Sequence, residues 1–104
     1  MNEIRNISIT RNDASGRYHM TVDGQEAGFV AFEQSDTHIA FTHTELLDAF
    51  QGQGVGSRLA AEALADAASQ GLTIIPLCPY MARYLERHPI DGARIDWPTS
   101  PPRS

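Results

Sequence analysis

At the middle of this chain stands the stretch Gln51-Gly52-Gln53-Gly54-Val55-Gly56-Ser57-Arg58-Leu59, in which glycine alternates with other residues. It follows a β-branched, apolar segment, 38–46, which is typical of a strand, and it opens an alanine-rich segment, 57–70, which is typical of a helix. The first amides of a helix have no partner within it and carry the positive end of its dipole, and glycines let an anion approach them closely. We therefore expect a strand-to-helix turn that holds an anion such as a pyrophosphate.

Before the glycine stretch, the sequence predicts four strands. We expect them around 4–9 and at 17–22, 25–32 and 38–46. The first carries Ile4, Ile7 and Ile9 among polar residues, as an edge strand does, and the turn formers at 11–16 end it. The second and third flank Asp23-Gly24, the pair most typical of a two-residue hairpin turn, and are expected to be antiparallel neighbours.

After the glycine stretch, the sequence predicts a helix, a strand and a second helix. The first helix spans 57–70, where leucines and alanines form an apolar stripe, and Gly71 ends it. Segment 72–77 is almost wholly apolar, as in a strand buried on both faces, and its connection through the helix makes it parallel to the fourth strand. The second helix begins at Pro79 and ends at His88-Pro89.

A length of 104 residues allows one domain. We expect this domain at 1–91 and a proline-rich tail at 92–104, anchored only by Trp97 and loosely packed or disordered beyond it. The net charge of −5, with arginine in place of any lysine, argues against binding nucleic acid. A single cysteine, no apolar leader and no apolar run long enough for a membrane indicate a cytoplasmic protein.

The motif Gln51-x-x-Gly54-x-Gly56 resembles the signature of the GNAT superfamily of acyl-coenzyme A dependent N-acetyltransferases. Two flanking blocks extend the resemblance: His43-Thr44-Glu45, and Pro76-Leu77-Cys78-Pro79-Tyr80 with Tyr84 and His88-Pro89. Together they are similar to a small, single-domain subfamily over residues 18–89. The resemblance implies a minimal α+β fold: a mixed, mostly antiparallel sheet with one parallel strand–helix–strand unit and two main helices.

The resemblance also implies that acetyl-coenzyme A (acetyl-CoA) binds at the glycine stretch, with no metal. Gln51 opens the signature, and the pyrophosphate meets the amides of Gln53, Gly54, Val55, Gly56 and Ser57. Arg58 supplies a nearby positive charge. Main-chain groups of Leu46 and Leu47 pair with pantetheine like an added strand, in a gap where the fourth and fifth strands splay apart.

Other interpretations of the glycine stretch fit less well. A dinucleotide-binding loop needs a glycine where Ser57 stands, follows the first strand and not the fourth, and needs an acidic residue where Pro76 stands. A P-loop needs a lysine, and the chain has none. A tight turn that binds nothing needs one glycine, and each further one costs about 1 kcal/mol of backbone freedom.

Acetyl transfer to an amine needs a base, donors for the oxyanion and an acid for the leaving thiolate. Glu45 is the candidate base, or else a strand-end carboxylate held by Thr44 or an arginine; His43 shares its face and is interpreted as a hydrogen-bonded core histidine. Cys78, between two prolines beside a helix N-terminus, is a candidate acyl carrier, base or acid, although free cysteines also pack as small hydrophobes. Tyr80 and Tyr84 lie one turn apart on the second helix, where the superfamily often has a tyrosine that protonates the departing coenzyme A. Tyr84 is the preferred match, or else packs as an amphipathic core tyrosine.

Two function classes stay open. The first is an acetyl-CoA-dependent N-acetyltransferase that acts on a primary amine, directly or through Cys78. Most members of the superfamily that this chain resembles have one or two helices between the first two strands, which build the acceptor pocket, but here only residues 11–16 separate them. The resemblance therefore implies an open acceptor side, which favours a bulky or peptidic amine unless a dimer partner covers it. The second is a non-catalytic acyl-CoA-binding or protein-interaction module. A monomer and a homodimer both fit.

Overall fold

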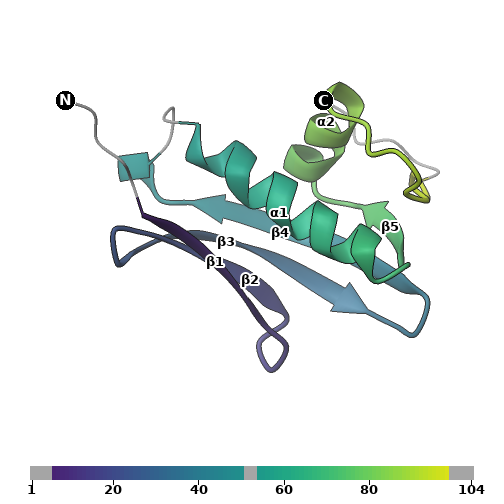
Figure 1. Ribbon diagram of the computed structural model, residues 1–104, viewed down its shortest axis with the longest axis horizontal. Helices are drawn as coiled ribbons and strands as arrows, with labels where there is room; N and C mark the ends of the chain where they lie inside the picture. Colours follow the sequence, from purple (N-terminus) through teal and green to yellow (C-terminus); the bar gives the residue numbers. More distant parts are fainter. Residues whose placement is uncertain (1–5, 51–53, 99–104) are drawn as a thin grey trace.

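The computed structural model describes residues 6–50 and 54–98, in which two helices cover one face of a five-stranded sheet (Figure 1). The strands lie side by side in chain order: β1 (Ile7–Asn12), β2 (Arg17–Val22), β3 (Gln25–Gln34), β4 (His38–Leu46) and β5 (Thr73–Pro76). β1 to β4 are antiparallel, and β5 runs parallel to β4. A 3-10 helix, Asp48–Phe50, follows β4, and the α-helices are α1 (Val55–Ser69) and α2 (Pro79–Arg87). The expected α+β fold is confirmed.

The hairpin between β2 and β3 turns where the sequence predicts. Asp23 and Gly24 have φ angles of 53° and 83°. Positive φ at both central positions is the geometry of a type I′ turn, whose twist matches that of the flanking strands. The Asp23 carboxylate also accepts a hydrogen bond from the Asn6 amide at 2.9 Å, which ties the start of β1 to this turn.

The α1 helix begins two residues earlier than expected, at Val55 and not at Ser57. Gly54 precedes it in the left-handed conformation, with φ of 80°. At the other end the helix stops at Ser69, and Gly71 takes a φ of 75°, as expected of a glycine stop. In the described part of the chain, no helix is both long enough and apolar enough to cross a membrane.

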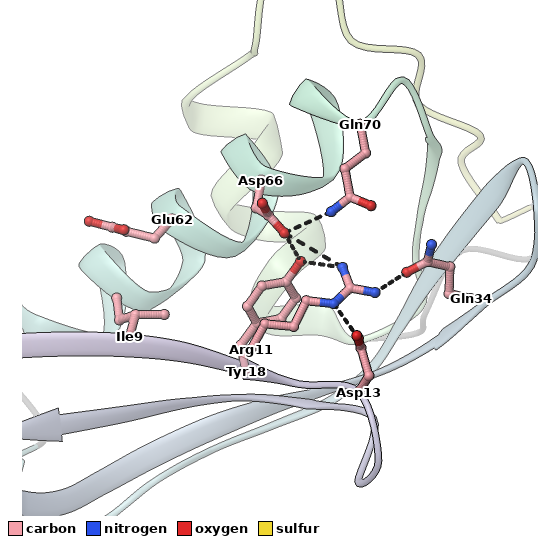
Figure 2. Close-up of a pocket in the computed structure, with 8 residues that line it drawn as sticks. All are labelled: Ile9, Arg11, Asp13, Tyr18, Gln34, Glu62, Asp66 and Gln70. Atoms are coloured by element: carbon pink, nitrogen blue, oxygen red, sulfur yellow. Dashed lines mark hydrogen bonds and ion pairs between the residues drawn. The ribbon is translucent and has the colours of Figure 1, made fainter.

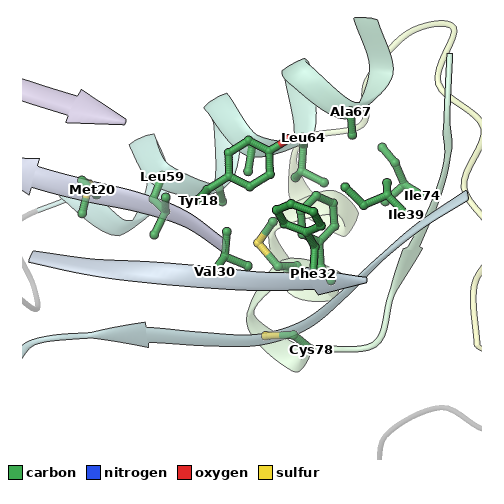
Figure 3. Packing of buried hydrophobic residues seen from close by; sticks show 14 of the residues in the cluster. Tyr18, Met20, Val30, Phe32, Ile39, Leu59, Leu64, Ala67, Ile74 and Cys78 are labelled. Atoms are coloured by element: carbon green, nitrogen blue, oxygen red, sulfur yellow. The ribbon is translucent and has the colours of Figure 1, made fainter. Parts of the chain in front are cut away.

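The core lies between the sheet and the two helices (Figure 3). Its largest fully buried side chains come from both layers: Phe41, Met20, Ile39, Leu59, Leu64, Ile74, Met81, Val22, Val30 and Pro76. Each buried aliphatic or aromatic side chain contributes about 1.5–3 kcal/mol. This packing fixes the start of α1 beside the end of β4.

A β-bulge at Thr42 changes which residues of β4 face the helices. Phe41 pairs with Phe32, but His43 pairs with Ala31, so Thr42 is an extra residue on the β4 side. Beyond Phe41, β4 pairs with β3 and, among the described residues, with no strand on its other edge. β4 therefore continues past the end of β5, and because β5 pairs with β4 over its whole length, the expected splay between the two strands stays a prediction.

The strand β5 is shorter and less buried than expected. It spans Thr73–Pro76, with Ile75 only partly buried, and Leu77 is 49% exposed. The expectation of a strand buried on both faces is wrong, because no helix covers the second face of the sheet in the described part of the chain.

The segment after α2 returns to the sheet beside β5. The Ile74 amide donates to the Arg94 carbonyl at 2.9 Å, and the Asp96 amide donates to the Ile74 carbonyl at 2.8 Å. Ile95 is partly buried against the core, whereas Trp97 is 44% exposed. The anchor is therefore Ile95, and the expectation that Trp97 alone serves is wrong. Residues 99–104, where we expect loose packing, lie outside the described residues.

Candidate functional site

A pocket of about 480 Å³ opens where the start of α1 meets the end of β4 and the first turn of α2. Its lining comes from all three elements: Thr44, Leu46, Gly54, Gly56, Ser57, Leu59 and Tyr80. Four of these, Leu46, Gly54, Gly56 and Ser57, are among the residues that the sequence assigns to coenzyme A. The glycine turn thus lies at a hollow large enough for part of a ligand.

The two described glycines of the stretch, Gly54 and Gly56, are required for different structural reasons. Gly54 has a left-handed φ, and an added Cβ would meet nothing within 4 Å, so the backbone conformation requires glycine there. Gly56 lies inside α1, and an added Cβ would come within 2.5 Å of the Tyr80 Oη atom and 3.3 Å of Leu46 Cδ2. Among the described residues, no side chain caps the N terminus of α1. Its first amides therefore have no side-chain cap among the described residues, and the helix starts at residues that line the pocket.

Tyr80 brings a hydroxyl group to this helix start. Burial raises the pKa of Tyr80 above its usual 10.0, while a hydrogen bond with the Ser57 side chain opposes the shift. The phenol consequently stays protonated at neutral pH and can donate a proton or a hydrogen bond in the pocket. The family resemblance favours Tyr84, one helical turn later, for such a role.

Cys78 does not line the pocket but contacts Thr44, which does. It is 4% exposed and occupies the N-cap position of α2, where its amide donates to the Phe41 carbonyl at 2.9 Å. Its Sγ atom lies 3.1 Å from Thr44 Oγ1, and Thr44 lines the pocket. The thiol therefore contacts the pocket through the threonine hydroxyl.

Glu45 faces the other side of the sheet. Its neighbours Thr44 and Leu46 face the pocket, so alternation along the strand turns Glu45 and His43 to the uncovered face. Their side chains are 58% and 61% exposed and form an ion pair at 3.5 Å when the histidine is charged. The interpretation of His43 as a core histidine is wrong, because the Thr42 bulge places it outside the core.

Three other described residues that were predicted to bind coenzyme A, Leu47, Val55 and Arg58, are not among those that line the pocket. Val55 is buried, and Arg58 forms an ion pair with Glu62 at 2.9 Å. The Leu47 amide donates to Ala27, and its carbonyl accepts from Phe50, so both its main-chain groups already have partners. Gln51 and Gln53 lie outside the described residues.

Tyr84 lies farther along α2. Its ring stacks on that of His88, with centroids 4.3 Å apart, and lines a separate hollow. Of the three catalytic candidates, only Cys78 therefore approaches the pocket. Thr44 and Tyr80 line it without having been assigned to the site, although Thr44 stands two residues from Leu46 in a strand and so shares its face.

A larger hollow, about 590 Å³, lies between β1, β2 and the second half of α1 (Figure 2). The Asp66 carboxylate there accepts hydrogen bonds from the Tyr18 hydroxyl at 2.6 Å and the Gln70 amide at 2.9 Å, and lies 3.5 Å from Arg11. Arg11 also pairs with Asp13 and donates to Gln34. The groups in this hollow bind one another, which indicates a structural network that ties α1 to the first hairpin.

In the same described ranges, no group of three or more His, Cys, Asp or Glu residues is placed to hold a metal ion. No curated protein sequence matches the chain. A family model described as GCN5-related N-acetyl-transferase matches residues 17–94, which include β2 to β5 and both helices. Because this match covers well over half of the 104 residues, the chain belongs to the GCN5-related N-acetyltransferase family.

Proposed function

We propose that this protein transfers an acetyl group from acetyl-CoA to a primary amine. One observation carries the proposal: in a chain of an acetyltransferase family, the pocket opens at a helix start that no described side chain caps. The amides of the first turn of α1 are free to bind a diphosphate there, helped by the helix dipole. We also propose that the protein is located in the cytoplasm and acts as a monomer or a homodimer.

The reaction forms a C–N bond and breaks the C–S bond of the thioester. The amine must be neutral to attack, so its proton passes to a base, and the leaving thiolate takes up a proton. Tyr80 lines the pocket and stays protonated, so we assign it the second proton transfer, the role predicted for Tyr84. The Thr44 hydroxyl lies 3.1 Å from the Cys78 Sγ atom, where either group can donate, and this contact is compatible with a direct transfer and with one through the thiol.

Glu45 stays the proposed base, and its position sets the direction of the acceptor. The carboxylate lies on the uncovered face of the sheet, in the part of β4 beyond its last pair with β5. An amine that arrives from this face meets Glu45 while the thioester lies on the helix side. The short 13–16 turn between β1 and β2 leaves that approach open, which suits a peptide or protein amine.

One observation favours the alternative, a non-catalytic acyl-CoA-binding module. Cys78 is 4% exposed, Glu45 lies on the opposite face, and Tyr84 lines another hollow, so the three predicted catalytic groups do not converge. Binding without turnover is the result expected of such a module.

The test has two steps. Acetyl-CoA at about 100 times its Kd should add about 2.7 kcal/mol to the free energy of unfolding, which raises Tm by about 10 °C or more, while NAD at the same concentration should not. Free-thiol release with a panel of amines and amine-bearing peptides then measures turnover. Binding with thiol release supports the transferase, binding without release supports the module, and an unchanged Tm contradicts both.

Mass spectrometry separates the two routes of transfer. An acetyl adduct that forms on mixing with acetyl-CoA and disappears in Cys78→Ala supports transfer through the thiol. Full turnover by Cys78→Ala supports direct attack.

A further inference from the structure

A second hollow, about 200 Å³, adjoins the acetyl-CoA pocket along α2. It is lined by Ser57, Tyr80, Arg83, Tyr84, Arg87 and His88. Ser57 and Tyr80 line both hollows, so the two are neighbours on either side of these side chains. The second hollow thus extends the pocket away from the catalytic candidates Cys78 and Glu45.

Two arginines give this hollow a positive charge. Arg83 and Arg87 are exposed and stand one turn apart on α2, so their like charges repel each other. Within residues 6–50 and 54–98, neither has a carboxylate oxygen within 4.0 Å, whereas Arg11 and Arg58 are both paired. The positive charge of the hollow is therefore not neutralised by the described part of the chain.

The hollow also offers a flat aromatic surface. The rings of Tyr84 and His88 stack with an interplanar angle of 21°. Aromatic rings of this kind are common partners for nucleobases, and arginine is the preferred partner of phosphate because its planar group donates two parallel hydrogen bonds.

We propose that this second hollow binds the 3′-phosphorylated adenosine end of acetyl-CoA, with Arg83 and Arg87 on the 3′-phosphate. The proposal rests on the proposed function, because the diphosphate at the start of α1 delivers the adenosine to the neighbouring hollow. A 3′-phosphate carries close to two negative charges at neutral pH, which matches two unpaired guanidinium groups. It gives Tyr84 a binding role in place of the predicted catalytic one.

Calorimetric titration tests this with two ligands that differ only in the phosphate: acetyl-CoA and 3′-dephospho-acetyl-CoA. The full chain should bind acetyl-CoA about 10- to 100-fold more tightly. The double variant Arg83→Gln, Arg87→Gln should bind both ligands equally, with the affinity that the wild type has for the dephospho ligand. Arg94→Gln, which removes one exposed arginine on another segment, should keep the wild-type preference.

The outcomes separate this inference from the function on which it depends. If the wild type binds both ligands with equal affinity, the acetyl-CoA pocket stands and the 3′-phosphate site is refuted. A double variant that keeps the preference also refutes it. If neither ligand binds the wild type, the proposed function fails too. All three arginines are exposed, so circular dichroism should show unchanged folding for each variant.

Discussion

Removing the Tyr18 hydroxyl should destabilise the fold, because it removes the hydrogen bonds that Tyr18 forms with Asp66 and Arg11 in Figure 2. Tyr18 is 3% exposed, donates to Asp66 at 2.6 Å and accepts from Arg11 at 3.0 Å. A hydrogen bond to a charged group contributes about 1.5–3 kcal/mol. In the variant, Asp66 still accepts a hydrogen bond from Gln70, and because its side chain is 42% exposed, water can take the place of the lost Tyr18 donor. Tyr18→Phe should therefore cost about 1.5–2 kcal/mol, or about 6–10 °C in Tm.

The pH dependence of this cost provides a second check. Burial, followed by the hydrogen bond to Asp66, raises the pKa of Tyr18 above its usual 10.0. The folded chain then keeps a proton that the unfolded chain loses, so the stability from Tyr18 is complete below pH 10 and falls as the pH rises further. The gap between wild type and Tyr18→Phe should narrow by about 1.4 kcal/mol for each pH unit above 10.

Urea unfolding at pH 7 and at several values up to about pH 11 measures both effects. Tyr84→Phe is the matched control, because the Tyr84 hydroxyl forms no hydrogen bond with a described residue, and it should change the free energy of unfolding by less than about 0.5 kcal/mol. Equal stability of Tyr18→Phe and wild type at pH 7, or a gap that does not change above pH 10, would refute the network as we describe it.

Three further predictions test other parts of the structure. Gly54→Ala should lower the free energy of unfolding by about 1–2 kcal/mol, because residue 54 has a left-handed φ that alanine disfavours. Gly54→Asn should lower it clearly less, and equal losses in urea unfolding would contradict a conformational requirement for glycine. Gly56→Ala should displace the Tyr80 side chain, and the free energy of unfolding should change by less than about 1 kcal/mol, because the gain in helix propensity offsets the loss of the Tyr80–Ser57 hydrogen bond. The same change should weaken acetyl-CoA binding at least tenfold in calorimetry, and unchanged affinity would count against the pocket. Ile95→Ala should lower the free energy of unfolding by about 1–2 kcal/mol and Trp97→Ala by less than half of that, and the reverse order would show Trp97 to be the anchor.

Much of the fold follows from local sequence chemistry. Asp23-Gly24 specifies the hairpin because few residue pairs accept two positive φ angles, and Gly71 stops α1 for the same reason. The parallel arrangement of β4 and β5 follows from the helix that connects them. These features depend on residues close in the chain, which a sequence displays directly.

The parts that sequence patterns did not predict depend on contacts between distant segments. Strict alternation from Phe41 would put His43 and Glu45 on the helix side, but the bulge at Thr42 reverses the pattern, and a bulge depends on pairing with β3. Ile95 becomes the anchor because β5 leaves its outer edge open to the returning chain. The Tyr80 hydroxyl reaches α1 through the packing of two helices, which no local spacing encodes.

The central claim is that a coenzyme A diphosphate binds the amides at the start of α1. The most direct measurement is a ¹H–¹⁵N correlation spectrum of the labelled chain during titration with acetyl-CoA. We predict saturable shifts of the Gly54, Val55, Gly56 and Ser57 amides, larger than those of residues around the Asp66 network. Saturable binding whose shifts spare these four amides, or shifts centred on that network, would contradict the account.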